Sequence, residues 1–306
     1  MRSRIEFIAF RILRQLVLFL PLKSAQRFGR MLGSIAYYLI GSRRGIALDN
    51  LRYAFPGKSQ AELAVIAKGS FQNYGITMME FLWFPNMTDE DLGRLVKVRN
   101  RELMEEGFSR GKGMVMLAGH FGNWELIAFA VGYLSRMPFT IIVQTQSNRL
   151  IDEFINRQRC LRGNTVIPMG ISVREIIKAL NNKRIIAIAP DQSGPMEGVF
   201  VEFFGRRVAT HQGPAVLALR HGAPLQIGFM VRQRDGTYEV TLEEIPFPDL
   251  SGYSEENVLE LTRRHTAVLE ERIRQYPDHW LWMHRRWKHT WENVQAKKRT
   301  VTQLHA

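Results

Sequence analysis

The stretch that decides the fold runs from Met114 to Glu125 and reads M-V-M-L-A-G-H-F-G-N-W-E. Its first part, Met114–Ala118, is a short apolar run bounded by glycines, which is typical of a buried strand. The helical pattern L-I-A-F-A-V-G-Y-L follows, and Asn123 is a suitable N-cap for that helix. His120 therefore falls in the turn between strand end and helix start, where ligands bind in open α/β sheets.

His120 and Glu125 are the residue types of a general base and its orienting acid. An imidazole in this turn can accept a proton, and a carboxylate in the first helical turn can hydrogen-bond the ring, fix its tautomer and stabilise the imidazolium. The competing interpretation is a turn histidine beside an ordinary first-turn glutamate. The position at a strand end, with glycines on both sides, favours the functional interpretation.

The box H-F-G-N-W-E resembles the His-x4-Asp/Glu motif of glycerolipid acyltransferases. Three later blocks stand in the same order as those of the late lauroyl/myristoyl lipid A acyltransferases: A-P-D-Q at 189–192, F-F-G-R-R-V-A-T at 203–210 and P-D-H-W-L-W-M-H-R-R-W-K at 277–288. The resemblance covers most of the chain. Mycobacterial mannoside acyltransferases share this pattern, so the family leaves the acceptor open.

The resemblance implies an acyltransferase that moves a fatty acyl chain from acyl carrier protein or acyl-CoA to a hydroxyl of an anionic glycolipid, with a lipid A precursor as the first choice. His120 would be the base and Glu125 its orienting acid, without a cofactor. The implied location is the cytoplasmic face of a bacterial inner membrane. Two alternatives stay open: another acceptor (a mannoside or an amino-acid lipid), or a non-catalytic membrane- or carrier-binding protein of the same fold, whose box would be broken.

The charge balance predicts an anionic partner. Lys and Arg number 42 against 29 Asp and Glu, a formal net charge of +13, and such an excess favours anionic lipid, a phosphorylated substrate or nucleic acid. Nucleic acid is disfavoured because no zinc-finger or RNP-like motif occurs. The histidines and the single Cys160 show no metal-ligand spacing, so no metal is expected, and one cysteine excludes a disulfide framework.

The amino terminus predicts a membrane-anchoring helix within residues 1–22. The apolar segment 5–20 is interrupted by Glu6, Arg11 and Arg14, and it is short for a span, which needs roughly 20 apolar residues. Its basic and apolar positions fall on different sides of a helical wheel, which suits a helix lying in the membrane interface. A helix packed on the core and a tilted single span are the alternatives.

The rest of the chain is divided into an acyltransferase domain, 23–291, and a polar basic tail, 292–306, expected to be disordered. Within the domain a helical lead-in, 23–110, precedes an α/β core, 111–291. Strands are predicted at 114–118, 139–144, 165–168 and 185–189, alternating with helices at 123–134, 149–161 and 173–180. This alternation predicts a mainly parallel sheet flanked by helices, with strand 139–144 next to strand 114–118.

Further candidate substrate-binding residues follow the later strands and helices. By resemblance, Arg159 or Arg162 helps to bind a phosphate, for which the bidentate guanidinium is suited; a solvated helix end is the alternative, and the choice between the two arginines is open. The resemblance also implicates Asp191, at the end of strand 185–189, in acceptor binding or catalysis. The remaining candidates are Asn123, Thr210 and Gly213, the last two at a helix N-terminus that can face an anion.

The block from His279 to Lys288 combines tryptophans with basic residues. Such a mixture suits an interface with anionic headgroups. Buried core aromatics with surface arginines are the alternative.

Overall fold

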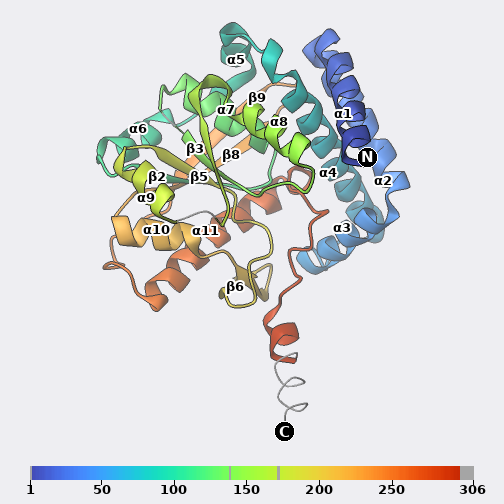
Figure 1. Cartoon of the computed structure of the whole chain (residues 1–306). Coiled ribbons are helices and arrows are strands. Elements are labelled where there is room, and N and C mark those ends of the chain that lie inside the picture. The colour runs from blue at the N-terminus through green and yellow to red at the C-terminus, as the bar shows by residue number, and fades with distance from the viewer. Residues whose placement is uncertain (1, 138, 171–172, 297–306) are drawn as a thin grey trace.

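A seven-stranded sheet forms the centre of the molecule (Figure 1), with the strand order β1-β9-β8-β2-β5-β3-β4. The computed structural model describes residues 2–137, 139–170 and 173–296. The strands of the sheet are β1 (Val96–Val98), β2 (Met114–Ala118), β3 (Phe139–Val143), β4 (Thr165–Pro168), β5 (Ile185–Ile188), β8 (Leu225–Arg232) and β9 (Tyr238–Glu244). A separate antiparallel pair is formed by β6 (Val199–Phe203) and β7 (Arg206–Thr210).

The sheet is mainly parallel, as predicted. Strand β2 lies in the middle and pairs in parallel with β5 on one side and β8 on the other, while β9 runs antiparallel to β8. The predicted pairing of 139–144 with 114–118 is wrong, because β5 lies between β2 and β3. The crossover from β2 through α7 therefore skips one strand position, which β5 fills later.

Helices cover both faces of this sheet (Figure 1). Met114 and Met116 of β2 pack in the cluster that includes α7, whereas Val115 and Leu117 point to the opposite face, into the cluster with α10 and α11, as the two-residue period of a strand requires. The helices of this part are α6 (Arg101–Ser109), α7 (Trp124–Leu134), α8 (Arg149–Arg159), α9 (Val173–Asn181), α10 (Gly213–His221) and α11 (Glu255–Gln275), with short turns η2 (Leu161–Gly163) and η3 (Pro277–His279).

The first four helices gather on one side of the α/β part (Figure 1). They are α1 (Arg2–Phe19), α2 (Leu22–Leu39), α3 (Gly41–Ala54) and α4 (Gln60–Trp83), and η1 (Phe84–Asn86) and α5 (Asp89–Leu95) follow them in the chain. Helices α2 and α4 approach so closely that a Cβ on Gly75 would lie 2.2 Å from the carbonyl oxygen of Gly29. The contact therefore requires glycine, and it fixes the long α4 against the rest of the lead-in.

The expected disorder of the polar tail needs correction. Residues 291–296 are helical, so disorder from Glu292 onward is wrong for that part, while 297–306 lie outside the described residues. Within the described parts of the chain, no helix is both long enough and apolar enough to cross a membrane.

Candidate active site

His120 lies at the carboxyl end of β2, in a turn whose backbone is fixed on several sides. Its N–H donates to Asp191 Oδ2 at 2.7 Å, and its carbonyl accepts from the N–H of Leu281 at 3.0 Å. Two residues later, the N–H of Gly122 donates to the carbonyl of His279 at 2.9 Å. The imidazole is thus carried by a turn that the carboxyl-terminal segment holds in place.

Asp191 is the partner of the imidazole. It follows β5, the strand beside β2, and its Oδ1 lies 2.8 Å from His120 Nδ1. Its second oxygen also accepts from the indole N–H of Trp280 at 2.9 Å. The carboxylate holds the proton on Nδ1 and leaves Nε2 as the basic nitrogen.

Each member of the His120–Asp191 pair shifts the pKa of the other. Burial alone would raise the pKa of Asp191, but the charge of His120 and hydrogen bonds from His120 and Trp280 outweigh it and hold the pKa at about 2. Burial alone would lower the pKa of His120, and the attraction of the Asp191 carboxylate reverses this, so that the pKa is raised above its usual value. Both pKa shifts favour the state in which the imidazole is protonated and the carboxylate is charged.

Glu125 does not hydrogen-bond the imidazole, contrary to the sequence-based expectation. Its two oxygens accept from Arg159, with Nε at 2.9 Å and Nη2 at 2.5 Å. A bidentate, charge-assisted pair is stronger than a bond to a neutral ring, and α8 brings the guanidinium over the first turn of α7. Glu125 still favours the charged imidazole through space.

The two candidate arginines lie at different places. Arg159 lines the cavity in front of His120. Arg162 instead ion-pairs with Asp89, donates to the carbonyl of Met87 at 2.6 Å and stacks over Tyr133. Tyr133 is near the far end of α7, a helix of 11 residues and hence about 16 Å long. Arg162 is therefore excluded from the site around His120.

Three other candidate binding residues lie outside the cavity lining. Asn123 is fully buried, accepts from the N–H of Leu126 at 2.9 Å as the cap of α7 and donates to Glu80 at 2.6 Å. Thr210 is buried and accepts from Arg286 at 2.7 Å, and it does not cap α10. Gly213 is exposed at the start of α10 and, like Asn123 and Thr210, is absent from the cavity lining.

A cavity of about 1300 Å³ opens in front of His120. Its inner wall is apolar and lies between the sheet and α7, with Met116, Ile127, Val131, Phe139, Ile141 and Ala187. Its polar lining includes Glu125, Arg159, Gln192, Arg285 and Lys288. Among the described residues, no group of three or more His, Cys, Asp or Glu side chains is placed to hold a metal ion.

Sequence reasoning missed the contacts made by Gln192 and Trp280. Gln192 approaches the imidazole, with Nε2 3.3 Å from His120 Nε2, and Trp280 binds Asp191. Both stand in the blocks A-P-D-Q and P-D-H-W that carried the family resemblance. The blocks therefore indicated that these residues belong to the site, but they did not predict which atoms are in contact.

The aromatic residues of the 279–288 block belong to the core. Trp280, Trp282 and Trp287 are buried, and Arg286 is buried over the ring of Phe203. The core interpretation is therefore correct for them. Arg285 and Lys288, however, are exposed at the cavity, and their side chains make no hydrogen bond or ion pair with any described residue.

The sequence G-F-S-R-G at 107–111 matches the G-x-S-x-G motif of a nucleophile elbow but does not have the structure of one. Ser109 ends α6 and donates to the carbonyl of Glu106 at 2.7 Å. An elbow places its serine on a strand-to-helix turn at the site. Ser109 precedes β2, at the opposite end of that strand from His120, so it is excluded as the nucleophile of this cavity.

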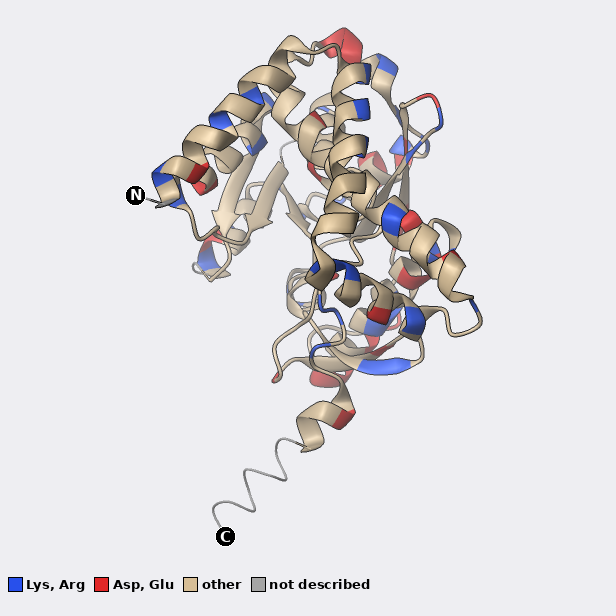
Figure 2. Cartoon of the chain, turned by 90° about the vertical axis from the view of Figure 1, so that its right-hand side faces the viewer, with Lys and Arg blue, Asp and Glu red and all other residues tan. Residues whose placement is uncertain are grey.

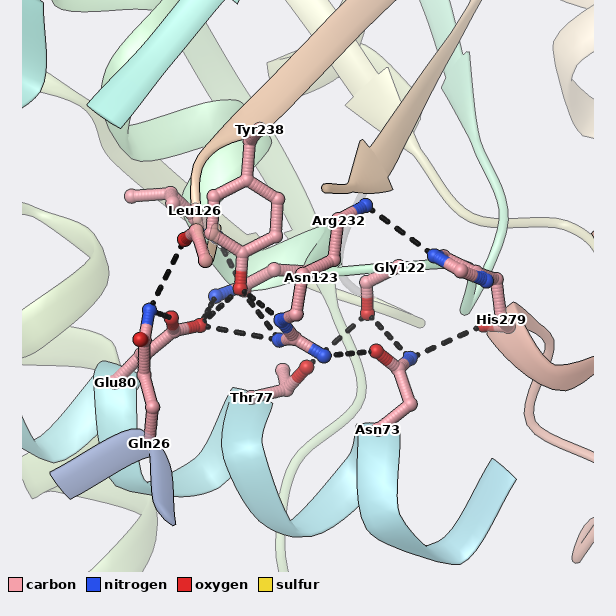
Figure 3. A network of polar contacts seen from close by, with 11 residues as sticks. Gln26, Asn73, Thr77, Glu80, Gly122, Asn123, Leu126, Arg232, Tyr238 and His279 are labelled. Atoms are coloured by element: carbon pink, nitrogen blue, oxygen red, sulfur yellow. Dashed lines mark hydrogen bonds and ion pairs between the residues drawn. The ribbon is translucent and has the colours of Figure 1, made fainter. Parts of the chain in front are cut away.

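A buried polar network clamps the turn after His120 to the lead-in (Figure 3). The carbonyl of Gly122 accepts from Asn73 at 3.0 Å and from Thr77 at 3.1 Å, both on α4. Glu80, also on α4 and 0 % exposed, accepts from Asn123 and from Arg232 at 3.2 Å. The hydroxyl of Tyr238 donates to the same carboxylate, and Gln26 of α2 donates to its other oxygen at 2.7 Å.

Glu80 is the acceptor on which this network depends. Replacing Glu80 with alanine is expected to lower the free energy of unfolding by about 3–5 kcal/mol, because it leaves the buried Arg232 guanidinium without its counter-charge. Urea unfolding followed by circular dichroism measures the change. Glu90→Ala, at an exposed position of α5, is the matched control and should change the free energy of unfolding by no more than about 0.5 kcal/mol. Equal effects of the two changes would show that the buried Glu80–Arg232 pair does not stabilise the fold more than an exposed glutamate does.

A histidine–aspartate dyad on a strand-end turn, facing a large and partly apolar cavity, is the arrangement of a catalytic site. The chain belongs to the bacterial lipid A biosynthesis acyltransferase family, whose profile matches residues 2–289. This confirms the family resemblance of the four sequence blocks. The chain is therefore an acyltransferase, and its family supports a glycolipid acceptor.

The relatives have low sequence identity to this chain, and two of the three match it over most of its length. The chain is 29% identical over 287 residues to the lipid A biosynthesis lauroyltransferase of Escherichia coli, covering 92% of this chain and 91% of that protein. It is 27% identical over 266 residues to the lipid A biosynthesis palmitoleoyltransferase of the same organism, covering 85% and 83%. A phosphatidylinositol mannoside acyltransferase of Mycobacterium tuberculosis is 25% identical over 162 residues, 51% of each chain.

Proposed function

We propose that the protein transfers a fatty acyl chain from a thioester, on acyl carrier protein or coenzyme A, to a hydroxyl of a lipid A precursor, with His120 as general base. The observation that carries this proposal is the imidazole whose Nδ1 is held by Asp191 at 2.8 Å while the ring lines the large, partly apolar cavity. That arrangement supplies a base where a long acyl chain can lie.

The proposed reaction is direct transfer. The acceptor hydroxyl gives its proton to Nε2 of His120 as its oxygen forms a bond to the thioester carbonyl carbon. The carbonyl π pair moves onto oxygen and gives a tetrahedral oxyanion. When that pair returns, the C–S bond breaks, the thiolate leaves with the bonding pair, and the proton on His120 passes to the thiolate or to water. Asp191 stabilises the imidazolium throughout.

The two halves of the cavity suit the two ends of such substrates. The apolar wall between the sheet and α7 can take the acyl chain, whose burial is favourable by about 0.8 kcal/mol for each CH₂. Arg285 and Lys288 give the entrance a positive charge without a partner among the described side chains. An acidic carrier or an acceptor phosphate would complement that charge.

Arg159 and Glu125 have a shared role in this proposal. Because Glu125 takes both guanidinium donors that face it, the pair fixes one wall of the cavity and keeps a negative charge near the imidazole. The proposed contribution of Glu125 is thus electrostatic, through the charge of His120, and not a direct hydrogen bond to the base.

The test of the function is an acylation assay with the purified full chain. A lauroyl thioester and a lipid A precursor are incubated with the enzyme, and mass spectrometry is expected to show the acceptor gaining one lauroyl group. A phosphatidylinositol mannoside is the competing acceptor. Preferential acylation of the mannoside would replace the proposed acceptor, and binding without transfer to either would favour the non-catalytic alternative.

Membrane attachment through α1 is part of the proposal. Helix α1 packs on α4 and α8 with Val17 buried and Phe10 against Phe154. Its other side exposes an apolar stripe of Ile5, Ile8, Ile12, Leu16 and Phe19. Figure 2 shows Lys and Arg recurring along this helix, which starts at the N mark. An apolar stripe with basic neighbours suits the interface of an anionic membrane.

The division of the chain follows from this attachment. We retain residues 1–22 as the anchoring segment and 23–291 as the acyltransferase domain. That domain would be held at the cytoplasmic face of the inner membrane, where it meets its substrates.

The stripe on α1 can be tested without removing the helix. The double change Ile8→Glu and Ile12→Glu is expected to lower partition onto phosphatidylglycerol-containing vesicles at least ~10-fold, because burying one isoleucine side chain is worth roughly 1.5–3 kcal/mol. Vesicle co-flotation of the full chain measures it. Val65→Glu, at an exposed position of α4, is the control. Unchanged flotation of the double variant would place the anchor elsewhere.

A further inference from the structure

The amide of Gln192 lies next to the imidazole of His120 in the cavity. Its Nε2 lies 3.3 Å from Nε2 and 3.5 Å from Nδ1 of His120. Nδ1 pairs with Asp191, which leaves Nε2 as the basic nitrogen, and the amide nitrogen of Gln192 lies beside it. The side chain lines the cavity and makes no other hydrogen bond among the described residues.

We infer that Gln192 is a catalytic residue that donates an N–H to the oxyanion of the tetrahedral intermediate. The inference rests on the proposed acyl transfer and adds a residue to it. Because the amide nitrogen lies 3.3 Å from Nε2, its N–H groups are close to the atoms that react at that nitrogen.

The geometry of attack brings the carbonyl oxygen into reach of this amide. The hydroxyl oxygen must lie within hydrogen-bond distance of Nε2, and the carbonyl carbon about 3–3.5 Å beyond it. The carbonyl oxygen then falls close to the groups that surround Nε2. Gln192 is neutral, so it stabilises the charge by donation alone. No proton leaves the amide, and the electron pair returns from oxygen as the C–S bond breaks.

Three other donors of the described site are already used. Arg159 donates to Glu125, and the indole N–H of Trp280 donates to Asp191. The hydroxyl of Ser193 points to the carbonyl of Gly194 at 3.5 Å. Of these groups Gln192 is the one whose donor faces the base itself.

The test separates an oxyanion donor from a group that only orients the ring. For Gln192→Ala, kcat is expected to fall roughly 10²–10³-fold, the loss typical of one oxyanion donor, with KM changed by less than about 3-fold, since the bond forms only in the transition state. The acid limb of the pH profile should stay in place because no charge is removed. Gln212→Ala is the matched control, because Gln212 is exposed, makes no side-chain cap hydrogen bond and is absent from the cavity lining.

A second variant keeps the test decisive if alanine perturbs the loop. Gln192→Glu preserves the shape but loses the donor and adds a negative charge, so kcat should fall further, and the acid limb should move to higher pH as the carboxylate favours imidazolium. The assay uses a lauroyl thioester and a lipid A precursor, with folding checked by thermal denaturation.

Three results would overturn the inference. If Gln192→Ala keeps kcat within about 3-fold while His120→Ala is inactive, the proposed function stands and the oxyanion role does not. If the acid limb shifts in Gln192→Ala, the residue acts through the imidazole and is a positioning residue. If His120→Ala itself remains active, the proposed base fails and the inference fails with it.

Discussion

Replacing His120 with alanine is expected to lower kcat roughly 10²–10⁴-fold, the range that general base catalysis contributes. The side chain is the one basic group that Asp191 orients towards the cavity, so the remaining activity would come from substrate binding and oxyanion stabilisation. The fold should persist, since the ring is 23% exposed and leaves the backbone bonds of the turn intact. Acylation rates and thermal denaturation measure the two effects.

A matched histidine substitution controls for loss of an imidazole in general. His221 lies in the last turn of α10 and is not part of the cavity lining, so His221→Ala should retain wild-type kcat. A folded His120→Ala protein with wild-type turnover would remove His120 from the mechanism.

Glu125 should show a graded response that reflects its partner. In Glu125→Ala the Arg159 guanidinium loses both of its bonds to the carboxylate, and its charge then opposes an imidazolium nearby, so activity should be impaired. Glu125→Asp keeps the negative charge with a shorter reach and should retain part of the activity. The acylation assay compares the two; equal losses would argue that geometry and not charge is what matters.

The local part of the site was predictable from the sequence. The alternation of apolar runs and helical patterns placed His120 at a strand end before α7, because those patterns depend on neighbours within a few residues. Asp191 was recognised through the family resemblance and through its place after a second apolar strand. Its contact with the imidazole was not predicted, because the position of β5 beside β2 depends on the packing order of the whole sheet.

The errors share that cause. Glu125 is close to His120 in sequence, and the nearer acid was assigned to the imidazole, but the direction of α7 and the approach of α8 decide which partner it meets. Arg162 was kept beside Arg159 because a short separation along the chain does not show that η2 turns away from the cavity. Glu80 and Arg232 meet across 152 residues, a distance over which a single sequence carries no pairing signal.

Replacing Asp191 with asparagine is expected to lower kcat about 10²–10⁴-fold and to shift the acid limb to lower pH. The carboxylate accepts three bonds, from His120 N–H, from Nδ1–H and from the indole of Trp280. An amide has one oxygen, and its NH₂ group cannot accept. The NH₂ would instead donate to Nδ1, which moves the ring proton to Nε2 and leaves no base facing the cavity.

The sign of the pH shift follows from the two opposing effects on the imidazole. Burial lowers the pKa of His120, and the charge of Asp191 more than reverses it. Asparagine keeps the burial and removes the charge, so the pKa of His120 falls. Because the base acts when unprotonated, the acid limb of kcat/KM must then move to lower pH, and the variant should lose least activity in the acidic range.

Asp278 offers the matched control, because it pairs with His279 Nδ1 at 2.9 Å in a similar aspartate–histidine contact but is absent from the cavity lining. Asp278→Asn should leave the acid limb in place. A limb that stays fixed in Asp191→Asn would mean that another group sets it, and one that rises would contradict the electrostatic coupling of the dyad. The direction of this shift therefore tests the feature that makes His120 a base. That feature is the buried carboxylate of Asp191, which accepts a hydrogen bond from Nδ1 and raises the affinity of Nε2 for a proton.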